Sequence, residues 1–169
     1  MRSHFAVLFV AVSMATVSHA QTTFTFGSVE IRMTSDDWAF EESRDDDRPW
    51  IFEKSETLGH FRRGDLLSHI SVSRFFGACS TVAEALQITR NQFGRECRVE
   101  KCERQIGGMG YSSLKATTLE PDSLVDECVF VQGRNEVIMI SVTAKRREDI
   151  DAFFGRILAG IKTEPNQQR

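Results

Sequence analysis

A dense run of carboxylates is the part of this sequence with the clearest capacity for chemistry. Seven acidic side chains stand within twelve residues, and Arg44 is the one basic residue among them. Two tryptophans, Trp38 and Trp50, bracket the central part of this run. Carboxylate oxygens suit a hard cation such as calcium, or the basic surface of another protein. The acidic residues are Asp36, Asp37, Glu41, Glu42, Asp45, Asp46 and Asp47.

Three interpretations of this acidic run stay open on the sequence alone. It is a solvated loop, a contact surface for a basic partner, or a calcium site. The run lacks the alternating acidic positions and the central glycine of an EF-hand loop, so that motif does not support a calcium site. Exposed tryptophans would anchor a partner, whereas buried ones would close the core.

The cysteines are the second candidate for chemistry. Their even number predicts two disulfides in an exported chain, with three possible connectivities. We expect a Cys97–Cys102 bridge to close a short loop and a Cys79–Cys128 bridge to join a helix start to a distant strand. The alternative is a redox-active pair, although four residues separate Cys97 from Cys102 where a thioredoxin-type motif has two.

Two histidines, His60 and His69, are the candidates for acid–base catalysis. Neither belongs to a Gly-x-Ser-x-Gly elbow or a His-Glu-x-x-His pair, so no catalytic residue is assigned. They also lack finger-like spacing to the cysteines, so no zinc site is predicted. The glycines of Gly107–Gly110 lie between expected strands and lack the helix N-terminus that holds a phosphate. We therefore expect no cofactor.

The first twenty residues have the pattern of a signal peptide. Arg2 provides the positive start, residues 5–12 form an uncharged apolar run, and Ser18 and Ala20 place small side chains before a cleavage site. No later segment is apolar over the roughly 20 residues that a membrane-spanning helix needs. The sequence thus predicts residues 1–20 as a signal peptide and 21–169 as one exported domain, periplasmic or extracellular.

The composition is that of a folded domain. The chain has 169 residues, of which 41% are hydrophobic and 27% charged, with a formal net charge of −3. This apolar fraction is too high for a disordered chain, and the length suits one domain. The slight acidity argues against a general nucleic-acid binder.

Two helices and several strands would position these side chains. Thr81 and Glu84 have the spacing of a capping box and predict a helix that ends near Gly94. Residues 125–132 and 136–144, separated by a turn, predict a hairpin. A second helix is expected over residues 150–161, because apolar residues recur there at helical spacing, and Pro165 follows its end. We therefore expect an α+β fold, an antiparallel sheet with two principal helices packed against it. The recurring apolar residues of the second helix are Ile150, Phe153, Phe154, Ile157, Leu158 and Ile161.

This layout resembles the PsbP-like superfamily, which includes the periplasmic DcrB-type proteins. The resemblance follows the order of elements: a strand with Trp38, a helix over residues 81–93, the turn before Tyr111, and a strand before the terminal helix. It implies an antiparallel sheet flanked by helices and a non-catalytic role in binding or assembly. The four cysteines depart from that pattern.

Together these features predict an exported, non-catalytic binding or assembly-factor domain. Its partner is expected to be a protein or a small ligand. The alternatives are a hydrolase that uses His60 or His69, a thiol oxidoreductase that uses Cys97 and Cys102, and a calcium-binding module.

Overall fold

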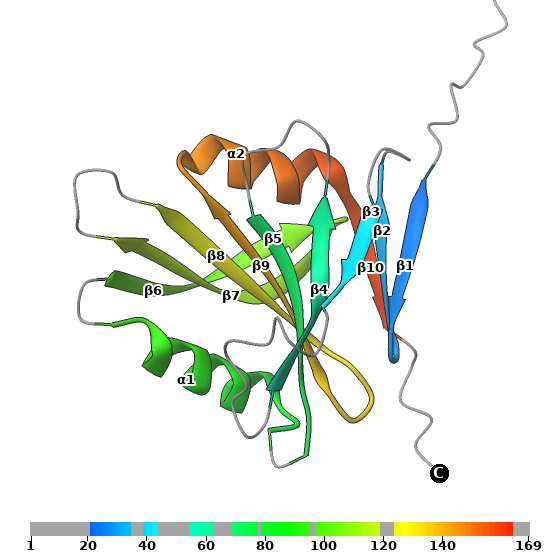
Figure 1. The fold of residues 1–169 in the computed structure, drawn as a ribbon, viewed down its shortest axis with the longest axis horizontal. Coiled ribbons are helices and arrows are strands. Elements are labelled where there is room, and N and C mark those ends of the chain that lie inside the picture. Colours follow the sequence, from blue (N-terminus) through cyan, green and yellow to red (C-terminus); the bar gives the residue numbers. More distant parts are fainter. Residues whose placement is uncertain are drawn as a thin grey trace, which may run out of the picture.

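The computed structural model describes residues 21–34, 39–43, 55–62, 69–77, 79–94, 97–118 and 124–163. These residues form two antiparallel sheets and two short helices (Figure 1). The small sheet has the order β1-β2-β10, and the large sheet has the order β3-β4-β5-β9-β8-β7-β6. The strands are β1 Thr22–Phe26, β2 Val29–Met33, β3 Ala39–Glu42, β4 Ser55–Arg62, β5 His69–Phe75, β6 Cys97–Ile106, β7 Met109–Thr118, β8 Val125–Gln132, β9 Val137–Ala144 and β10 Leu158–Thr163.

Helix α1, Val82–Gln92, packs on one face of the large sheet, against β7 and β8. Its start is the predicted capping box, because the Thr81 hydroxyl accepts from the backbone N–H of Glu84 and the Glu84 side chain returns to the backbone N–H of Thr81. The core beneath it contains Phe75, Leu86, Phe130 and Val137. We call this side of the large sheet the α1 face.

The opposite face of the large sheet packs against the small sheet and helix α2, Arg147–Ala152. Alternation along the strands explains this second core, since every other residue of β5, β8 and β9 points to it. Its fully buried members include Val29, Ile31 and Met33, which alternate along β2. We call this side the small-sheet face.

The antiparallel sheet is confirmed, but the prediction of two principal helices is wrong. Helix α2 has six residues, a five-residue π-turn follows over Phe153–Ile157, and the chain then enters strand β10. Strand β10 pairs with β2, with Ile161 opposite Ile31. Leu158 and Ile161 can bury their side chains either on a helix or on a strand. The spacing of the apolar residues therefore did not reveal that this segment pairs with the open edge of strand β2. The fold is therefore dominated by its sheets.

The predicted 125–144 hairpin is confirmed, with Val125 opposite Ala144 and Gln132 opposite Val137. The alternating run from Phe24 to Met33 divides into the β1–β2 hairpin, which turns at Gly27 with φ of 58°. Within the described residues, no helix is long and apolar enough to cross a membrane. The predicted signal peptide and Pro165 lie outside the described residues.

Candidate functional site

The structure places only two of the seven clustered carboxylates, Glu41 and Glu42, and both lie on β3. Alternation sends them to opposite sides of the large sheet. Glu41 is opposite His60 on the α1 face, and Glu42 faces the small sheet. These two carboxylates therefore do not form one surface. The residues Asp36, Asp37, Trp38, Asp45, Asp46, Asp47 and Trp50 lie outside the described residues.

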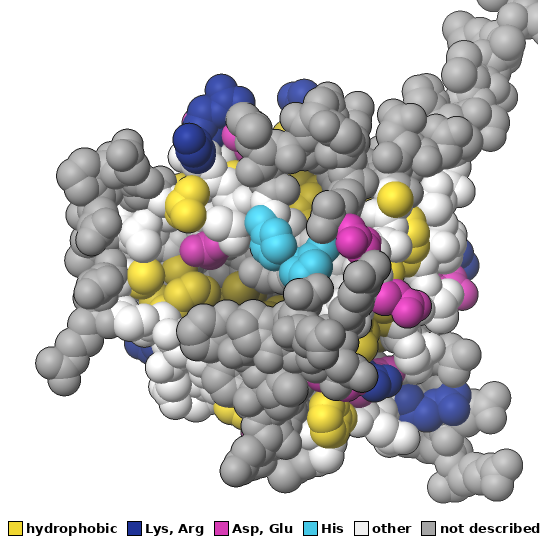
Figure 2. Space-filling view, in the orientation of Figure 1, with side chains coloured by type: hydrophobic (Ala, Val, Ile, Leu, Met, Phe, Trp, Pro, Cys, Tyr) yellow, Lys and Arg dark blue, Asp and Glu magenta, His cyan; other side chains and the backbone are white. Residues whose placement is uncertain are grey.

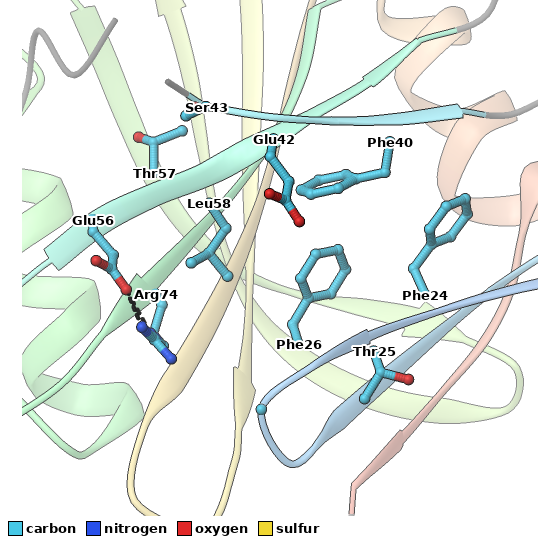
Figure 3. Close-up of a pocket in the computed structure, with 11 residues that line it drawn as sticks. Phe24, Thr25, Phe26, Phe40, Glu42, Ser43, Glu56, Thr57, Leu58 and Arg74 are labelled. Atoms are coloured by element: carbon cyan, nitrogen blue, oxygen red, sulfur yellow. Dashed lines mark hydrogen bonds and ion pairs between the residues drawn. The ribbon is translucent and has the colours of Figure 1, made fainter. Parts of the chain in front are cut away.

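Glu42 borders a cleft of about 400 Å³ between the small sheet and the edge of the large sheet (Figure 3). Strand β1 and its turn form one wall, and β3, β4 and β5 form the other. Apolar rings lie at one end of the cleft and charged groups at the other. The lining residues are Phe24, Thr25, Phe26, Gly27, Phe40, Glu42, Ser43, Glu56, Thr57, Leu58 and Arg74.

Three phenylalanines line the apolar end of this cleft, and they pack against the buried Phe61. Phe24 and Phe26 share one face of β1, and Phe40 is opposite Phe61 in the β3–β4 pairing. The ring centroids of Phe26 and Phe40 lie 4.8 Å apart, and those of Phe24 and Phe61 lie 4.9 Å apart, both edge to face. Gly59 permits this packing, because a Cβ there would lie 2.5 Å from Cζ of Phe40.

At the charged end of the cleft, Arg74 is paired with two carboxylates. Arg74 Nε donates to Glu56 Oε1 at 2.8 Å, and its Nη1 lies 3.8 Å from Glu136 Oε2. Glu136 Oε1 in turn accepts from the backbone N–H of Ser28 at 3.0 Å, which ties the β1–β2 turn to the β8–β9 hairpin. Arg74 is thus shared by two carboxylates and is not a free anion-binding group.

Glu42 has a different environment. Its side chain is exposed, and among the described residues it has no hydrogen bond or ion pair. In Figure 3 its carboxylate lies beside the Phe40 ring and above the Phe26 ring. The cleft therefore combines aromatic walls with a carboxylate that has no partner among the described residues, and its described lining contains no imidazole or thiol.

The two candidate histidines meet on the α1 face. Strands β4 and β5 bring the rings of His60 and His69 to a centroid distance of 4.5 Å. Figure 2 shows the two imidazoles side by side near the middle of this face, with acidic side chains on either side. Sequence reasoning treated these histidines separately, because only strand pairing makes them neighbours.

Strand register extends this polar patch across five strands. One row runs Glu41, His60, Ser71, Ser141 and Cys128, from β3 to β8. This row brings a carboxylate, an imidazole, two hydroxyls and a thiol to one face. Burial raises the pKa of the Cys128 thiol to about 12, so this sulfur stays protonated at neutral pH. A thiolate nucleophile is therefore not present at this position.

The next row runs His69, Thr143 and Asp126. Burial raises the pKa of Asp126, while a hydrogen bond from the Thr143 hydroxyl and the charge of His69 act in the opposite direction. Among the described residues no group of three or more histidine, cysteine, aspartate or glutamate side chains could hold a metal ion. The patch is an acid–base cluster without a metal-binding geometry.

The predicted Cys97–Cys102 bridge does not fit the geometry of strand β6 and is not formed in the structure. Both lie on the straight strand β6, five residues apart, which separates their Cα atoms by about 16 Å. A disulfide needs Cα atoms within about 7 Å. Alternation along the strands also places Cys102 on the small-sheet face, where its Sγ lies 2.9 Å from Oγ of Ser113. Cys97 and Cys128 lie on the α1 face.

The same geometry removes the structural basis for a Cys97–Cys102 redox pair. Cys79 and Cys128 remain compatible with each other, because both are buried in the core beneath α1. Their Cys79–Cys128 bridge, which is not formed in the structure, stays a prediction for oxidising conditions.

Sequence reasoning missed the cleft. The signal that could have indicated it is the spacing of Phe24 and Phe26, which places two rings on one side of a strand. The other wall of the cleft comes from β3, β4 and β5, and the sequence of these strands does not indicate that they lie close to β1.

Comparison with protein-family models finds no match, and comparison with curated proteins finds none. The fold is similar to the solution structure of cyanobacterial PsbP (CyanoP) from Synechocystis sp. PCC 6803, with a TM-score of 0.57 and 11% identity over 94% of this chain and 98% of that one. A crystal structure from Bacteroides thetaiotaomicron has a TM-score of 0.48 and 13% identity over 81% of this chain and 45% of that one. The chain therefore has a PsbP-like fold, as its resemblance to that superfamily predicted.

Proposed function

We propose that this chain is an exported, non-catalytic binding or assembly-factor domain, and that its partner binds at the cleft between the two sheets. The observation that carries this proposal is the cleft itself, which exposes aromatic surface beside a carboxylate without a partner among the described residues. Concave sites with apolar walls and a few polar groups are the usual form of ligand sites. The PsbP-like fold supports the same class of function by analogy.

Site-directed photo-crosslinking tests this proposal. Thr25 is an exposed residue at the rim of the cleft, and Gln105 is an exposed residue next to the β6–β7 turn. A photoreactive phenylalanine analogue at Thr25 should give a discrete adduct in the native extract, and the same analogue at Gln105 should not. Phe40→Ala, which removes a wall of the cleft, should abolish the Thr25 adduct. Equal labelling at both positions would contradict the proposal.

Export is a separate part of the proposal and has its own test. The signal-peptide pattern of residues 1–20 supports it. Expression of the full chain in a bacterial host should yield a secreted or periplasmic form whose N-terminal residue is Gln21. A cytoplasmic product that retains Met1 would contradict export.

A hydrolase is the second candidate, and the His69–Thr143–Asp126 row is the observation that favours it. An imidazole near a carboxylate can act as a general base. Activity against a panel of ester and amide substrates that is lost in His69→Ala would support this candidate. Activity that is unchanged in His69→Ala would exclude it.

A further inference from the structure

We propose that the cleft selects a cationic group with an apolar surface, an alkylammonium, through the Glu42 carboxylate and the rings of Phe26 and Phe40. This inference rests on the proposed binding function and specifies the chemistry of the ligand. Both rings and the exposed Glu42 side chain line the cleft.

The charges around the cleft favour a positive ligand. Arg74 is the one cation among the lining residues, and Glu56 and Glu136 hold it. Glu56 and Glu136 share this one guanidinium, and Glu42 has no cation beside it among the described groups of the cleft. An anionic ligand would be repelled by the net negative charge of the lining residues, and a neutral ligand would gain no electrostatic attraction from Glu42.

The rings define what kind of cation fits. A cation over an aromatic ring is attracted by the ring quadrupole, and the attraction grows when water is excluded. Phe26 is buried with 7% of its surface exposed and Phe40 is partly buried, so both rings have one side packed in the core. Their edge-to-face arrangement, with centroids 4.8 Å apart, turns the two rings in different directions near the Glu42 carboxylate (Figure 3).

A bare metal ion does not match this environment. Calcium and magnesium take six or more oxygen ligands, and zinc takes four close donors. Within the described part of the chain, Glu42 is the only charged oxygen donor at the apolar end of the cleft, and the rings offer none. An ammonium with methyl or methylene groups uses both features, because its charge faces the carboxylate while its carbon atoms contact the rings.

Two sources could supply such a group, a free small amine or the side chain of a lysine in a protein. Two probes distinguish them: choline, a free quaternary ammonium, and the tripeptide Gly-Lys-Gly with blocked ends. For choline the matched neutral control is 3,3-dimethyl-1-butanol, which has the same shape without the charge. For the peptide the control contains norleucine in place of lysine.

The experiment is an NMR titration of the mature chain, read at backbone amides around the cleft. At least one cationic probe should bind at least ten-fold more tightly than its neutral control. Glu42→Gln should remove this preference, and Phe40→Leu should weaken binding several-fold. Glu103→Gln, on the exposed strand β6, should leave it unchanged. Because Glu42 is exposed, its substitution should not disturb folding.

Each outcome decides the inference. Binding of choline assigns a free amine as the ligand class, and binding of the lysine peptide alone assigns a protein side chain. Equal binding of cationic and neutral probes at the cleft would overturn the inference and leave the proposed function standing. Absence of Glu42-dependent binding of both cations would also overturn it. The Thr25 photo-crosslink tests the proposed function independently of these probes.

Discussion

Arg104 and Glu127 form an ion pair in which the carboxylate has no exposed surface. Arg104 Nε donates to Glu127 Oε1 at 2.8 Å, and Arg147 donates to the other oxygen. Arg104 also reaches Asp151 at 2.9 Å, and its guanidinium lies 5.3 Å from the centroid of the Phe154 ring. The hydrogen bond that Arg104 donates to Glu127 is the main cause that raises the pKa of Arg104. These contacts join β6, β8 and α2 on the small-sheet face.

Glu127→Ala should destabilise the protein by about 3 kcal/mol, because it leaves two partly buried guanidinium groups without their shared carboxylate. Urea denaturation measures the free energy of unfolding. The control is Glu100→Ala, whose carboxylate is 55% exposed and pairs with the exposed Arg98, and it should cost less than about 1 kcal/mol. A loss below about 1 kcal/mol for Glu127→Ala would show that this ion pair does not brace α2.

The thiols should react with iodoacetamide in two classes. Cys97 and Cys102 are partly exposed, whereas Cys79 and Cys128 are buried. In the reduced native protein at pH 8, mass spectrometry should find the first two modified rapidly. Cys128 should react only after unfolding, because burial raises its pKa to about 12.

The same protein, oxidised under native conditions and digested, provides the second part of this test. No peptide should contain an intramolecular Cys97–Cys102 bridge, because strand β6 keeps the two sulfurs apart. Recovery of that bridge from folded monomer would contradict the β6 assignment.

Asp126 should make stability depend on pH in a defined direction. Burial is the main cause that raises the pKa of Asp126 in the folded state, so folding favours the protonated carboxyl. The stability that the protonated Asp126 contributes is fully present below the unfolded pKa near 3.8 and is lost as pH rises through the folded pKa. Asp126→Asn removes the buried charge and keeps an oxygen that accepts from Thr143.

The thermal midpoint of Asp126→Asn should therefore exceed that of the wild type at pH 8. The difference should shrink as pH falls toward 4. Thermal unfolding followed by circular dichroism across this range checks the expectation. A difference that is constant with pH would show that ionisation of Asp126 is not its cause.

Gly27→Ala should loosen the end of the cleft. Gly27 has φ of 58°, and an added Cβ would lie 1.9 Å from Glu136 Oε1, the atom that accepts from Ser28. Gly77→Ala is the matched control, since Gly77 has φ of 66° with nothing within 4 Å of an added Cβ.

The backbone strain is common to both variants and should cost about 1–2 kcal/mol. Gly27→Ala should cost about a further 1 kcal/mol, because Glu136 must leave its hydrogen bond to Ser28. Chemical denaturation of both variants measures the difference. Equal costs would show that Glu136 does not hold the β1–β2 turn.

Several elements could be predicted because their signals are local. The capping box at Thr81 and Glu84 depends on groups three residues apart, and the 125–144 hairpin depends on a short turn between alternating runs. The PsbP-like resemblance follows the order of such elements, and the fold comparison confirms it.

The failures have one physical cause. Residues 158–163 become strand β10 because β2 presents an open edge, and a sequence window over those residues contains no information about β2. The Cys97–Cys102 bridge was predicted from proximity in sequence, but an extended strand separates near neighbours and turns them to opposite faces.

Local side-chain pattern is enough to specify helix α1, the strand faces of β2 and β9 and the antiparallel class of the sheet. Pairing of β4 with β5 places His60 against His69, and packing of the small sheet on the large sheet places Phe26 beside Phe40 and Glu42. The two kinds of information differ because hydrogen bonds within a turn depend on residues a few positions apart, whereas a cleft between sheets exists only after β1, β3 and β4 have packed on one core.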